Sequence, residues 1–383
     1  MDTKILRLAM LSSLVFGLAS TQIGDGPAKA ESPCAKPGPF ALRKNKDLLR
    51  PDLKLEPAEL PPIQRKPRTT EQERKADQGA CVDPLTGKII ILPDPPARSE
   101  KDVDPGGDEG DPSLPRSNER EGAAPPFFLK ATVIPPEDRV LKSPTTSFPF
   151  RAVVQLRIAF PNSPVNKDGK LERACWCTGS LIDARHVLTA GHCVFKRGKK
   201  PCEGGWAQSI LVIPGLDGTI PPFDQDLVMP FGSDFGIFWR ADYVWLHKEI
   251  YPDADYALIT LGEGFPSLGS FGLLALSDDA LETTNAYLIG YPGELGHLPG
   301  TQQFAEPNGR PITDYENHSV EYEIDTSPGN SGGGVYRFWK NKRAIFAVHS
   351  TWYSDSNAGA RITKGRLNML RDWECTDGIQ SAC

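Results

Sequence analysis

Short apolar stretches separated by turn residues recur from about residue 132 to residue 362. Ala152 to Ile158 is one of them, and turn pairs such as Pro214-Gly215 and Asp217-Gly218 stand between the stretches. Repeated short strands with this punctuation are typical of an antiparallel sandwich or barrel, so we expect an all-β fold. Further strands are expected at residues 179–182, 187–189, 210–213, 256–261, 286–289, 320–324, 335–338 and 345–348.

The last part of the chain has a different periodicity. Leu367, Leu370 and Trp373 recur at near-helical spacing, which predicts one closing helix over residues 363–374. We expect this helix to pack against the β-structure rather than to carry chemistry.

The chain before residue 132 offers little apolar surface. Of the 36 prolines, 17 lie between residues 31 and 130, and no aromatic residue occurs between Phe40 and Phe127. Burial of so few apolar groups does not offset the entropy lost when the backbone is ordered. We therefore expect a largely disordered, proline-rich segment over residues 31–131, with one short hairpin formed by residues 81–84 and 89–92.

The first thirty residues have the pattern of an export signal. Lys4 and Arg7 precede an apolar run from Leu8 to Leu18, and small residues follow up to Ala30. We expect residues 1–30 to be removed as a signal peptide, which gives a secreted or periplasmic protein without a membrane span. In that oxidising setting the eight cysteines are expected to form disulfides.

The net charge and the absence of certain motifs exclude some classes of partner and cofactor. The formal net charge is −6 and no dense basic stripe occurs, so we do not expect nucleic acid as a partner. No cofactor or calcium-loop motif is visible, and we expect neither a cofactor nor a metal ion.

Four glycines and a proline surround Ser331 in the stretch from Asp325 to Gly334. A sharp glycine turn exposes a serine hydroxyl beside backbone N–H groups, which is the arrangement that an acyl-transfer nucleophile needs. The N–H groups of Gly329 and Ser331 would then form the oxyanion hole. A glycine-rich surface hairpin is the alternative, and this stretch alone does not decide between them.

His192 follows a strand, a turn and a second strand, and it lies between Gly191 and Cys193. A disulfide between Cys177 and Cys193 would hold His192 in place, and a loop of this size stabilises the fold by roughly 3 kcal/mol when it is closed. A zinc site built from Cys175, Cys177, His192 and Cys193 is the alternative, although the spacing fits no common zinc module.

Asp255 stands immediately before the apolar stretch from Tyr256 to Leu261. A carboxylate there would be partly desolvated and would need a partner, and His192 is the natural one. A strand-capping aspartate is the common alternative. Together, His192, Asp255 and Ser331 form a candidate catalytic set, in which the imidazole takes the serine proton and the carboxylate fixes the tautomer of the ring.

The three stretches resemble those of the chymotrypsin-like serine peptidases, in particular the bacterial glutamyl endopeptidase (V8-like) branch. The resemblance extends from about Val133 to Trp373. It implies two antiparallel six-stranded β-barrels, over about residues 148–262 and 265–362, within a peptidase domain of residues 132–383. The stretches that carry it are Thr189-Ala190-Gly191-His192-Cys193, Asp255-Tyr256-Ala257-Leu258-Ile259, Gly329-Asn330-Ser331-Gly332-Gly333, Phe148-Pro149-Phe150-Arg151 and Gly290-Tyr291-Pro292-Gly293.

The resemblance leaves two specificities open. Asp325 lies six positions before Ser331, where trypsin-like enzymes keep the carboxylate that binds Arg or Lys. His349 and Thr326 match the residues with which glutamyl endopeptidases bind an acidic side chain, and Ser350 is a further candidate pocket hydroxyl. We favour cleavage after Glu (or Asp), because a histidine beside a hydroxyl accepts a carboxylate that a buried aspartate would repel.

The resemblance also implies a zymogen. Asn330 precedes Ser331 and carries no charge for a new amino terminus to pair with. In the glutamyl branch the freed terminus instead approaches the specificity pocket. We expect an activating protease to cut at Ala131, Thr132 or Val133, which gives Val133 a place near the substrate, and we expect the product to be a monomer.

The other cysteines leave their pairing open. Cys34 and Cys81 would pair because they are alone in the amino-terminal part, whereas Cys175, Cys202, Cys375 and Cys383 permit three connectivities. We expect Cys175–Cys202 and Cys375–Cys383. Proteins or peptides are the expected substrates, and the remaining alternative is an inactive peptidase-like module that only binds them.

Overall fold

The computed structural model describes the chain from residue 45 to residue 376 with gaps. All described residues belong to one of two units of the chain, Pro33–Cys383, and none belongs to the other, Met1–Ser32. The predicted signal peptide, Cys34 and Cys383 lie outside the described residues. The ranges described are 45–50, 52–58, 60, 79–82, 89–91, 133–134, 136–218, 228–248, 252–296, 300–339, 342–353 and 355–376.

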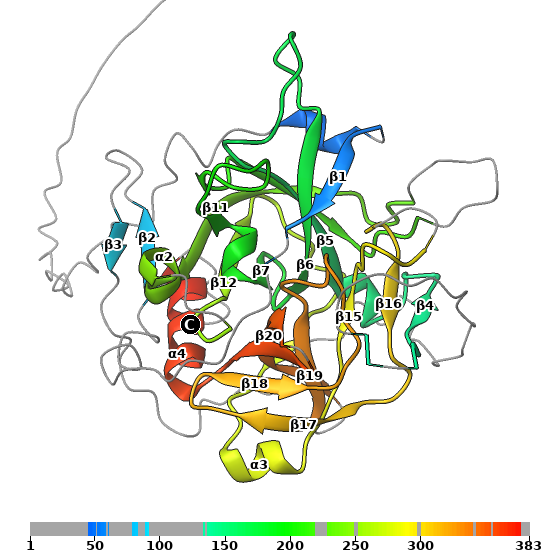
Figure 1. Ribbon diagram of the computed structural model, residues 1–383, viewed down its shortest axis with the longest axis vertical. Helices are drawn as coiled ribbons and strands as arrows, with labels where there is room; N and C mark the ends of the chain where they lie inside the picture. Colours follow the sequence, from blue (N-terminus) through cyan, green and yellow to red (C-terminus); the bar gives the residue numbers. More distant parts are fainter. Residues whose placement is uncertain are drawn as a thin grey trace, which may run out of the picture. The chain divides into compact units, whose positions relative to one another are not determined.

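Six antiparallel strands between residues 153 and 261 form a closed barrel (Figure 1). They run in the order β10-β5-β6-β7-β12-β11, and the pairing of β10 with β11 closes the ring. Their inward side chains, such as Leu156, Val187 and Leu258, are fully buried or nearly so. The strands are β5 (Val153–Ala159), β6 (Arg173–Leu181), β7 (His186–Thr189), β10 (Ser209–Pro214), β11 (Asp234–Asp242) and β12 (Ala257–Leu261), and a small hairpin of β8 (Phe195–Lys196) and β9 (Gly205–Trp206) follows the 3₁₀ turn η4 (Gly191–Cys193).

The second half forms a more open structure. Seven strands make one sheet, in the order β13-β20-β21-β18-β17-β14 with β19 paired to β20, and three further strands make a small sheet, β15-β16-β4. Val320, Tyr322 and Phe346 lie in its core. The strands are β4 (Val140–Lys142), β13 (Gly272–Leu273), β14 (Asn285–Ala286), β15 (Ile289–Gly290), β16 (Gln303–Ala305), β17 (Arg310–Tyr315), β18 (Ser319–Tyr322), β19 (Gly334–Trp339), β20 (Lys342–Trp352) and β21 (Asn357–Arg361).

The expected second barrel is less regular than the first. In the described residues, β13 and β14 do not pair with each other. Instead Tyr287, directly after β14, exchanges two backbone hydrogen bonds of 2.9 Å with Tyr336 on β19, and this single bridge joins the two ends of the sheet. The mostly β architecture itself is confirmed.

The closing helix, α4 (Lys364–Thr376), is confirmed near the predicted bounds. The hydroxyl of Thr363 accepts a hydrogen bond from the Arg366 N–H (3.2 Å) and so caps the first turn. Leu367, Leu370 and Trp373 are buried, and Trp373 stacks on Tyr256 at 6.4 Å between ring centroids. Two short helices, α2 (Tyr243–Lys248) and α3 (Asp278–Glu282), and the 3₁₀ turn η3 (Phe150–Ala152) were not expected from the sequence. In the described part of the chain, no helix has the length and apolarity needed to span a membrane.

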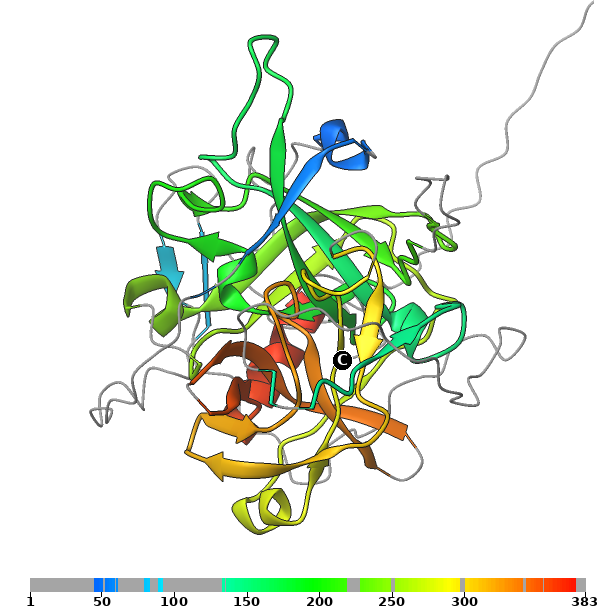
Figure 2. The same ribbon diagram turned by 45° about the vertical axis from the view of Figure 1, so that its right-hand side comes forward.

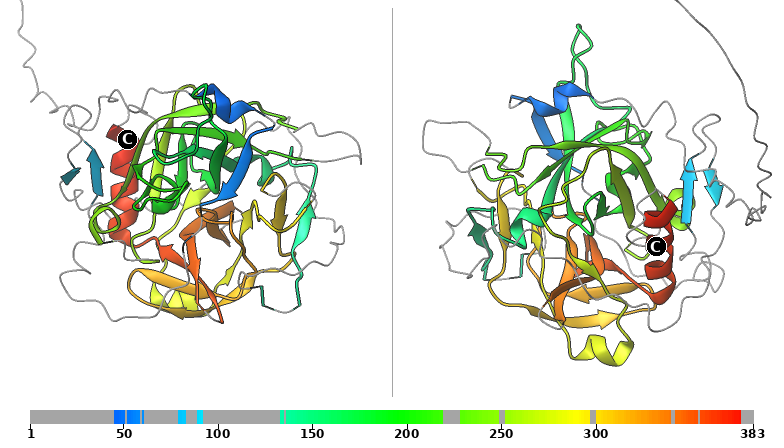
Figure 3. Two further views of the ribbon diagram at one scale, coloured as in Figure 1. Left: turned by 45° about the horizontal axis from the view of Figure 1, so that its top comes forward. Right: turned by 180° about the vertical axis from the view of Figure 1, so that it is seen from behind.

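Parts of the proline-rich segment are ordered against the barrel. A 3₁₀ turn, η1 (Lys46–Leu49), leads into β1 (Lys54–Pro57), which pairs in parallel with β6 (Figure 2). The expected hairpin is present as β2 (Gly79–Val82) and β3 (Ile89–Ile91), and β2 extends the barrel sheet at β11, on the side where α4 lies (Figure 3). The prediction that this segment is largely disordered is therefore wrong for residues 45–58, because backbone pairing to a strand edge needs little apolar surface.

Candidate active site

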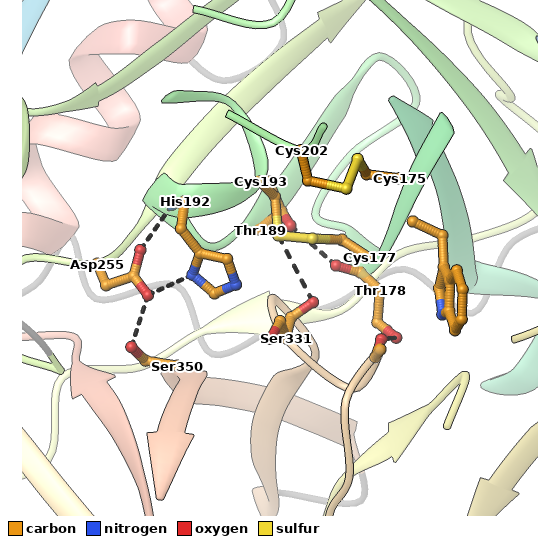
Figure 4. Close-up of a disulfide and its surroundings, with 12 residues drawn as sticks. Cys175, Cys177, Thr178, Thr189, His192, Cys193, Cys202, Asp255, Ser331 and Ser350 are labelled. Carbon is orange, nitrogen blue, oxygen red and sulfur yellow. Dashed lines mark hydrogen bonds and ion pairs between the residues drawn. A yellow bond between two sulfur atoms is a disulfide. The ribbon is translucent and has the colours of Figure 1, made fainter. Parts of the chain in front are cut away.

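A fully buried carboxylate joins the two halves of the structure. Asp255 Oδ1 accepts the backbone N–H of His192 (2.8 Å), and Oδ2 lies 2.6 Å from His192 Nδ1. The hydroxyl of Ser350, on β20, donates to the same Oδ2 (2.5 Å) (Figure 4). These three donors replace the water that burial removes, and they leave Nε2 as the acceptor nitrogen of a neutral His192 ring.

Packing fixes the positions of His192 and Asp255. His192 lies in η4, directly after β7, and a Cβ at Gly191 would lie 2.8 Å from the ring of Trp245 and 3.0 Å from Asp255 Oδ1. Only glycine fits this position without a shift of its neighbours. The guanidinium of Arg366 donates to the carbonyl of Asp253 and lies 4.7 Å from the ring centroid of Tyr256, so α4 holds the turn that carries Asp255.

Ser331 lies on a tightly held loop opposite the imidazole. Thr178 on β6 binds this loop twice, through its N–H to the Ser331 carbonyl (2.9 Å) and through its hydroxyl to the Gly329 carbonyl (2.8 Å). Gly329 and Gly332 have φ angles of +103° and +85°, which other residues rarely adopt. Figure 4 shows the His192 ring between Asp255 and Ser331, and Nε2 is buried without a partner among the described residues.

The backbone of the same loop offers two donors. The N–H groups of Gly329 and Ser331 have no acceptor within the part of the chain that the structure describes. A Cβ on Gly329 would lie 2.4 Å from Trp176 Nε1 and from the Tyr291 carbonyl. The loop can therefore take this form only with glycine at 329, and both N–H groups remain available to a ligand oxygen.

Two candidate pocket residues lie next to this loop, His349 on β20 and Thr326 in the irregular stretch after β18. His349 donates its N–H to the Gly333 carbonyl (2.9 Å), and its Nδ1 lies 2.8 Å from the hydroxyl of Tyr322 on β18. Burial, together with the nearby His192, lowers the pKa of His349 to about 3, so the ring is neutral near pH 7. The hydroxyl of Thr326 donates to Asn357 Oδ1 (2.6 Å) in the wall beside it.

Asp325 is buried, and one of its carboxylate oxygens already accepts a hydrogen bond. Its Oδ1 accepts the backbone N–H of Ile134 (2.7 Å), and its Oδ2 has no partner within the described chain. Carboxylate oxygens of Asp138, Glu306 and Asp325 lie within 4.8 Å of one another. Burial, offset in part by the Ile134 N–H and reinforced by Glu306, raises the pKa of Asp325 to about 7.

Family comparisons agree with this geometry. Residues 177–340 match the family described as "Trypsin-like peptidase domain", and residues 141–207 match the family "Trypsin". The chain is a chymotrypsin-like serine peptidase. It is accordingly a serine endopeptidase whose substrates are proteins or peptides.

Three curated relatives are similar to between 57% and 68% of the chain. An "Extracellular metalloprotease" of Bacillus subtilis (strain 168) is 28% identical over 245 residues, which are 63% of this chain and 70% of that protein. A "Glutamyl endopeptidase" of Bacillus licheniformis is 27% identical over 268 residues, or 68% and 74% of the two chains. "Serine protease 23" of Homo sapiens is 26% identical over 250 residues, or 57% and 62%.

Two solved structures are partly similar to this chain. A structure described as "Glu endopeptidase in complex with MPD" is 20% identical and covers 62% of the peptidase and 97% of its own chain, with a TM-score of 0.48. The protease Anisep from Arthrobacter nicotinovorans is 17% identical and covers 56% and 90%, with a TM-score of 0.42.

Two predicted disulfides are present in the peptidase. Cys177–Cys193 joins the ends of the histidine segment, and Cys175–Cys202 lies beside it. Because Cys177 and Cys193 are bonded to each other, they cannot serve as the thiolate ligands of the alternative zinc site. Cys375 is also disulfide-bonded, but Cys34, Cys383 and the side chain of Cys81 lie outside the described residues, so their pairing stays a prediction.

One site prediction is corrected. The sequence predicts a pocket hydroxyl at Ser350, but the structure directs this side chain to Asp255. The pairing of β20 with β21 shifts register between His349 and Thr351, and at this irregularity the Ser350 side chain turns to Asp255. Sequence reasoning also missed Tyr322 and Arg366, because a lone tyrosine on a strand and an arginine on a helix carry no pattern that points to a site.

The low pKa of His349 predicts a dependence of stability on pH. In the unfolded chain, His349 takes up a proton near the ordinary histidine pKa of about 6.5. In the folded chain it takes up this proton only near pH 3. The contribution of His349 to stability is thus present above about pH 6.5 and is lost as the pH falls. Urea unfolding of the Ser331→Ala chain at pH 7 and pH 5 should show a smaller loss of stability when His349→Gln is added, and an equal loss would contradict a buried, neutral ring.

Proposed function

We propose that the peptidase is a secreted enzyme that cleaves after Glu, or Asp, through an acyl-enzyme on Ser331, and that it is made as a zymogen. The observation that carries the catalytic assignment is the ordered contact from Ser350 to Asp255 to His192, with the free Nε2 on the side of Ser331. Such an arrangement supplies a nucleophile, a base and a group that orients the base.

The chemistry follows from these positions. His192 Nε2 takes the proton of the Ser331 hydroxyl as its oxygen attacks the substrate carbonyl carbon, and the N–H groups of Gly329 and Ser331 bind the resulting oxyanion. The tetrahedral intermediate collapses when Nε2–H protonates the leaving amine, which breaks the peptide bond. Water then attacks the acyl-enzyme with the same base, and the carboxylic acid leaves as Ser331 regains its proton.

His349 supports an acidic preference. Burial raises the pKa of Tyr322 well above its usual value, so its hydroxyl stays protonated and donates to His349 Nδ1. The neutral ring then carries its proton on Nε2, where it can donate to a substrate carboxylate. A bound Glu side chain would also favour protonation of the ring and so strengthen the contact.

Asp325 gives weaker support to the alternative, cleavage after Arg or Lys. Its side chain is buried and its Oδ1 already binds Ile134. A substrate cation would have to displace this contact or reach Oδ2 beside Glu306. The other alternative, an inactive binding module, leaves the complete hydrogen-bonded set of His192, Asp255 and Ser350 without a purpose.

The contact between Ile134 and Asp325 also supports maturation near Val133. This contact places the residues that follow the predicted cleavage sites beside three clustered carboxylates, those of Asp138, Glu306 and Asp325. Arg310 contacts two of the three, Asp138 and Glu306. An α-ammonium released here would supply charge that the cluster lacks. An activating protease, a monomeric product and a secreted location belong to this proposal.

A pair of chromogenic peptides tests the function. Peptides that end in Glu and in Arg before the chromophore should be cleaved by the secreted enzyme with a clear preference for Glu. Ser331→Ala should lower kcat by roughly 10⁶-fold. His349→Ala should lower kcat/KM for the Glu peptide more than for a matched peptide that ends in Gln. Faster cleavage after Arg would establish the alternative specificity, and equal rates for Ser331→Ala and the parent enzyme would rule out the catalytic assignment.

Amino-terminal sequencing tests maturation. The active secreted protein should begin at Ala131, Thr132 or Val133, because cleavage there frees a terminus beside the carboxylate cluster. A fully active protein that still begins at Glu31 would rule out the zymogen proposal.

The raised pKa of Asp325 gives a separate prediction for the uncleaved chain. Because its folded pKa of about 7 exceeds the ordinary value of about 3.9, stability should fall as the pH rises through this window. In a Ser331→Ala background, which prevents self-cleavage, Asp325→Asn should therefore unfold at higher urea concentration than its parent at pH 8. Glu263→Gln, at an exposed site just after β12, serves as the control, and an Asp325→Asn chain less stable than its parent would contradict the prediction.

A further inference from the structure

The docked segment, defined here as residues 45–50, 52–58 and 60, binds the barrel through backbone hydrogen bonding. Strand β1 pairs in parallel with the start of β6, with Lys54 opposite Arg173 and Pro57 opposite Trp176. The N–H of Ala58 then donates to the carbonyl of Trp176 (3.0 Å). This edge of β6 has β5 on its other side, so the docked segment completes the sheet there.

Apolar burial and polar contacts anchor the start of the docked segment. Leu48 is fully buried, whereas its neighbour Leu49 is 40% exposed. Asp47 Oδ2 accepts the N–H of Leu171 (2.8 Å), and Arg50 Nη1 donates to the carbonyl of Leu171 (3.0 Å). The two contacts bind one residue of the barrel from both sides, which fixes the register of β1 on β6.

A buried arginine of the barrel depends on the docked segment. Arg157, on β5, donates from Nη1 to the carbonyls of Leu48 (3.1 Å) and Arg50 (3.4 Å). Burial lowers the pKa of Arg157 to about 10, which reflects a cation held largely away from water. The segment thus covers a group that the barrel alone would leave without these two acceptors.

The docked segment ends beside the candidate active site. Its last pairing partner, Trp176, is in contact with Gly329, and Thr178, two residues further on β6, holds the Ser331 loop through two hydrogen bonds. The edge occupied by β1 is therefore continuous with the loop that carries the nucleophile. An extended polypeptide that crosses Ser331 and continues along β6 needs this same edge.

We infer that the docked segment is an internal inhibitor that excludes polypeptide substrates from the β6 edge, an inference that rests on the proposed peptidase function. The segment runs parallel to β6 and occupies the edge with its own backbone donors and acceptors. Cleavage near Val133 cuts the polypeptide between the docked segment and the barrel, and the edge becomes free only when the docked segment dissociates. Activation therefore has two steps, chain cleavage and strand release.

Undocking variants of the full chain test this inhibition. Leu48→Arg would bury a second cation beside Arg157, and Ala58→Pro removes the N–H that binds Trp176. Each should raise the rate at which the uncleaved chain hydrolyses a long Glu-containing peptide by about tenfold or more, because the edge is free for a larger fraction of the time. Leu49→Arg, at the exposed neighbouring position, should leave the rate unchanged.

Two further measurements make the outcome decisive. Rates are expressed per serine titrated with a phosphonofluoridate after full processing, and gels confirm that the chain is intact during the assay. Hydrogen exchange of β1 and β6 amides reports whether the segment has left. If β1 is released and the hydrolysis rate stays unchanged, the inhibitor proposal is wrong. It is also wrong if a variant only has fewer titratable serines and each of them works at the parental rate. A complete absence of titratable serine in every sample would instead refute the proposed function.

Discussion

A carboxylate with no access to water imposes the main constraint on this structure. Asp255 is stable in its place only if hydrogen-bond donors surround it, and they come from both halves of the fold: His192 from the barrel and Ser350 from β20. A shift between the halves would take the Ser350 hydroxyl away from this buried carboxylate, and a lost hydrogen bond to a charged group costs about 1.5–3 kcal/mol. The requirement to satisfy Asp255 therefore also fixes the imidazole relative to Ser331.

Asp325 is the opposite case. It is as deeply buried as Asp255, but one of its oxygens has no partner within the described chain, and Glu306 adds negative charge nearby. In the proposed zymogen, the unpartnered Oδ2 marks a place that a new amino terminus would complete. Under that proposal the two carboxylates have separate tasks: Asp255 keeps the reacting groups in position, and Asp325 responds to the state of the amino terminus.

Much of the site could be predicted from the sequence because its chemistry depends on local patterns. Glycines around Ser331, the cysteine beside His192 and the apolar strand after Asp255 each carry a physical requirement that is visible in a few residues. Ser350 was misassigned because the face of a strand depends on register, which the sequence does not give directly. The same holds for the second sheet, whose ends meet only through the single bridge between Tyr287 and Tyr336.

The docked segment shows a different limit. Strand addition uses backbone donors and acceptors, which every residue possesses, so the proline-rich composition of residues 31–131 gave no sign of β1. Strand β11 was missed for a related reason: its pairing with β12 shifts between Gly236 and Phe238, and this irregularity interrupts the alternation that identifies strands.

The most direct test of the central claim is to map the residue that a phosphonofluoridate modifies, by mass spectrometry, in the processed enzyme and in its Asp255→Asn variant. We expect the adduct on Ser331, formed roughly 10⁴-fold more slowly when Asp255 no longer fixes the tautomer of His192. An adduct on another residue, or an equal rate in the variant, would contradict the account.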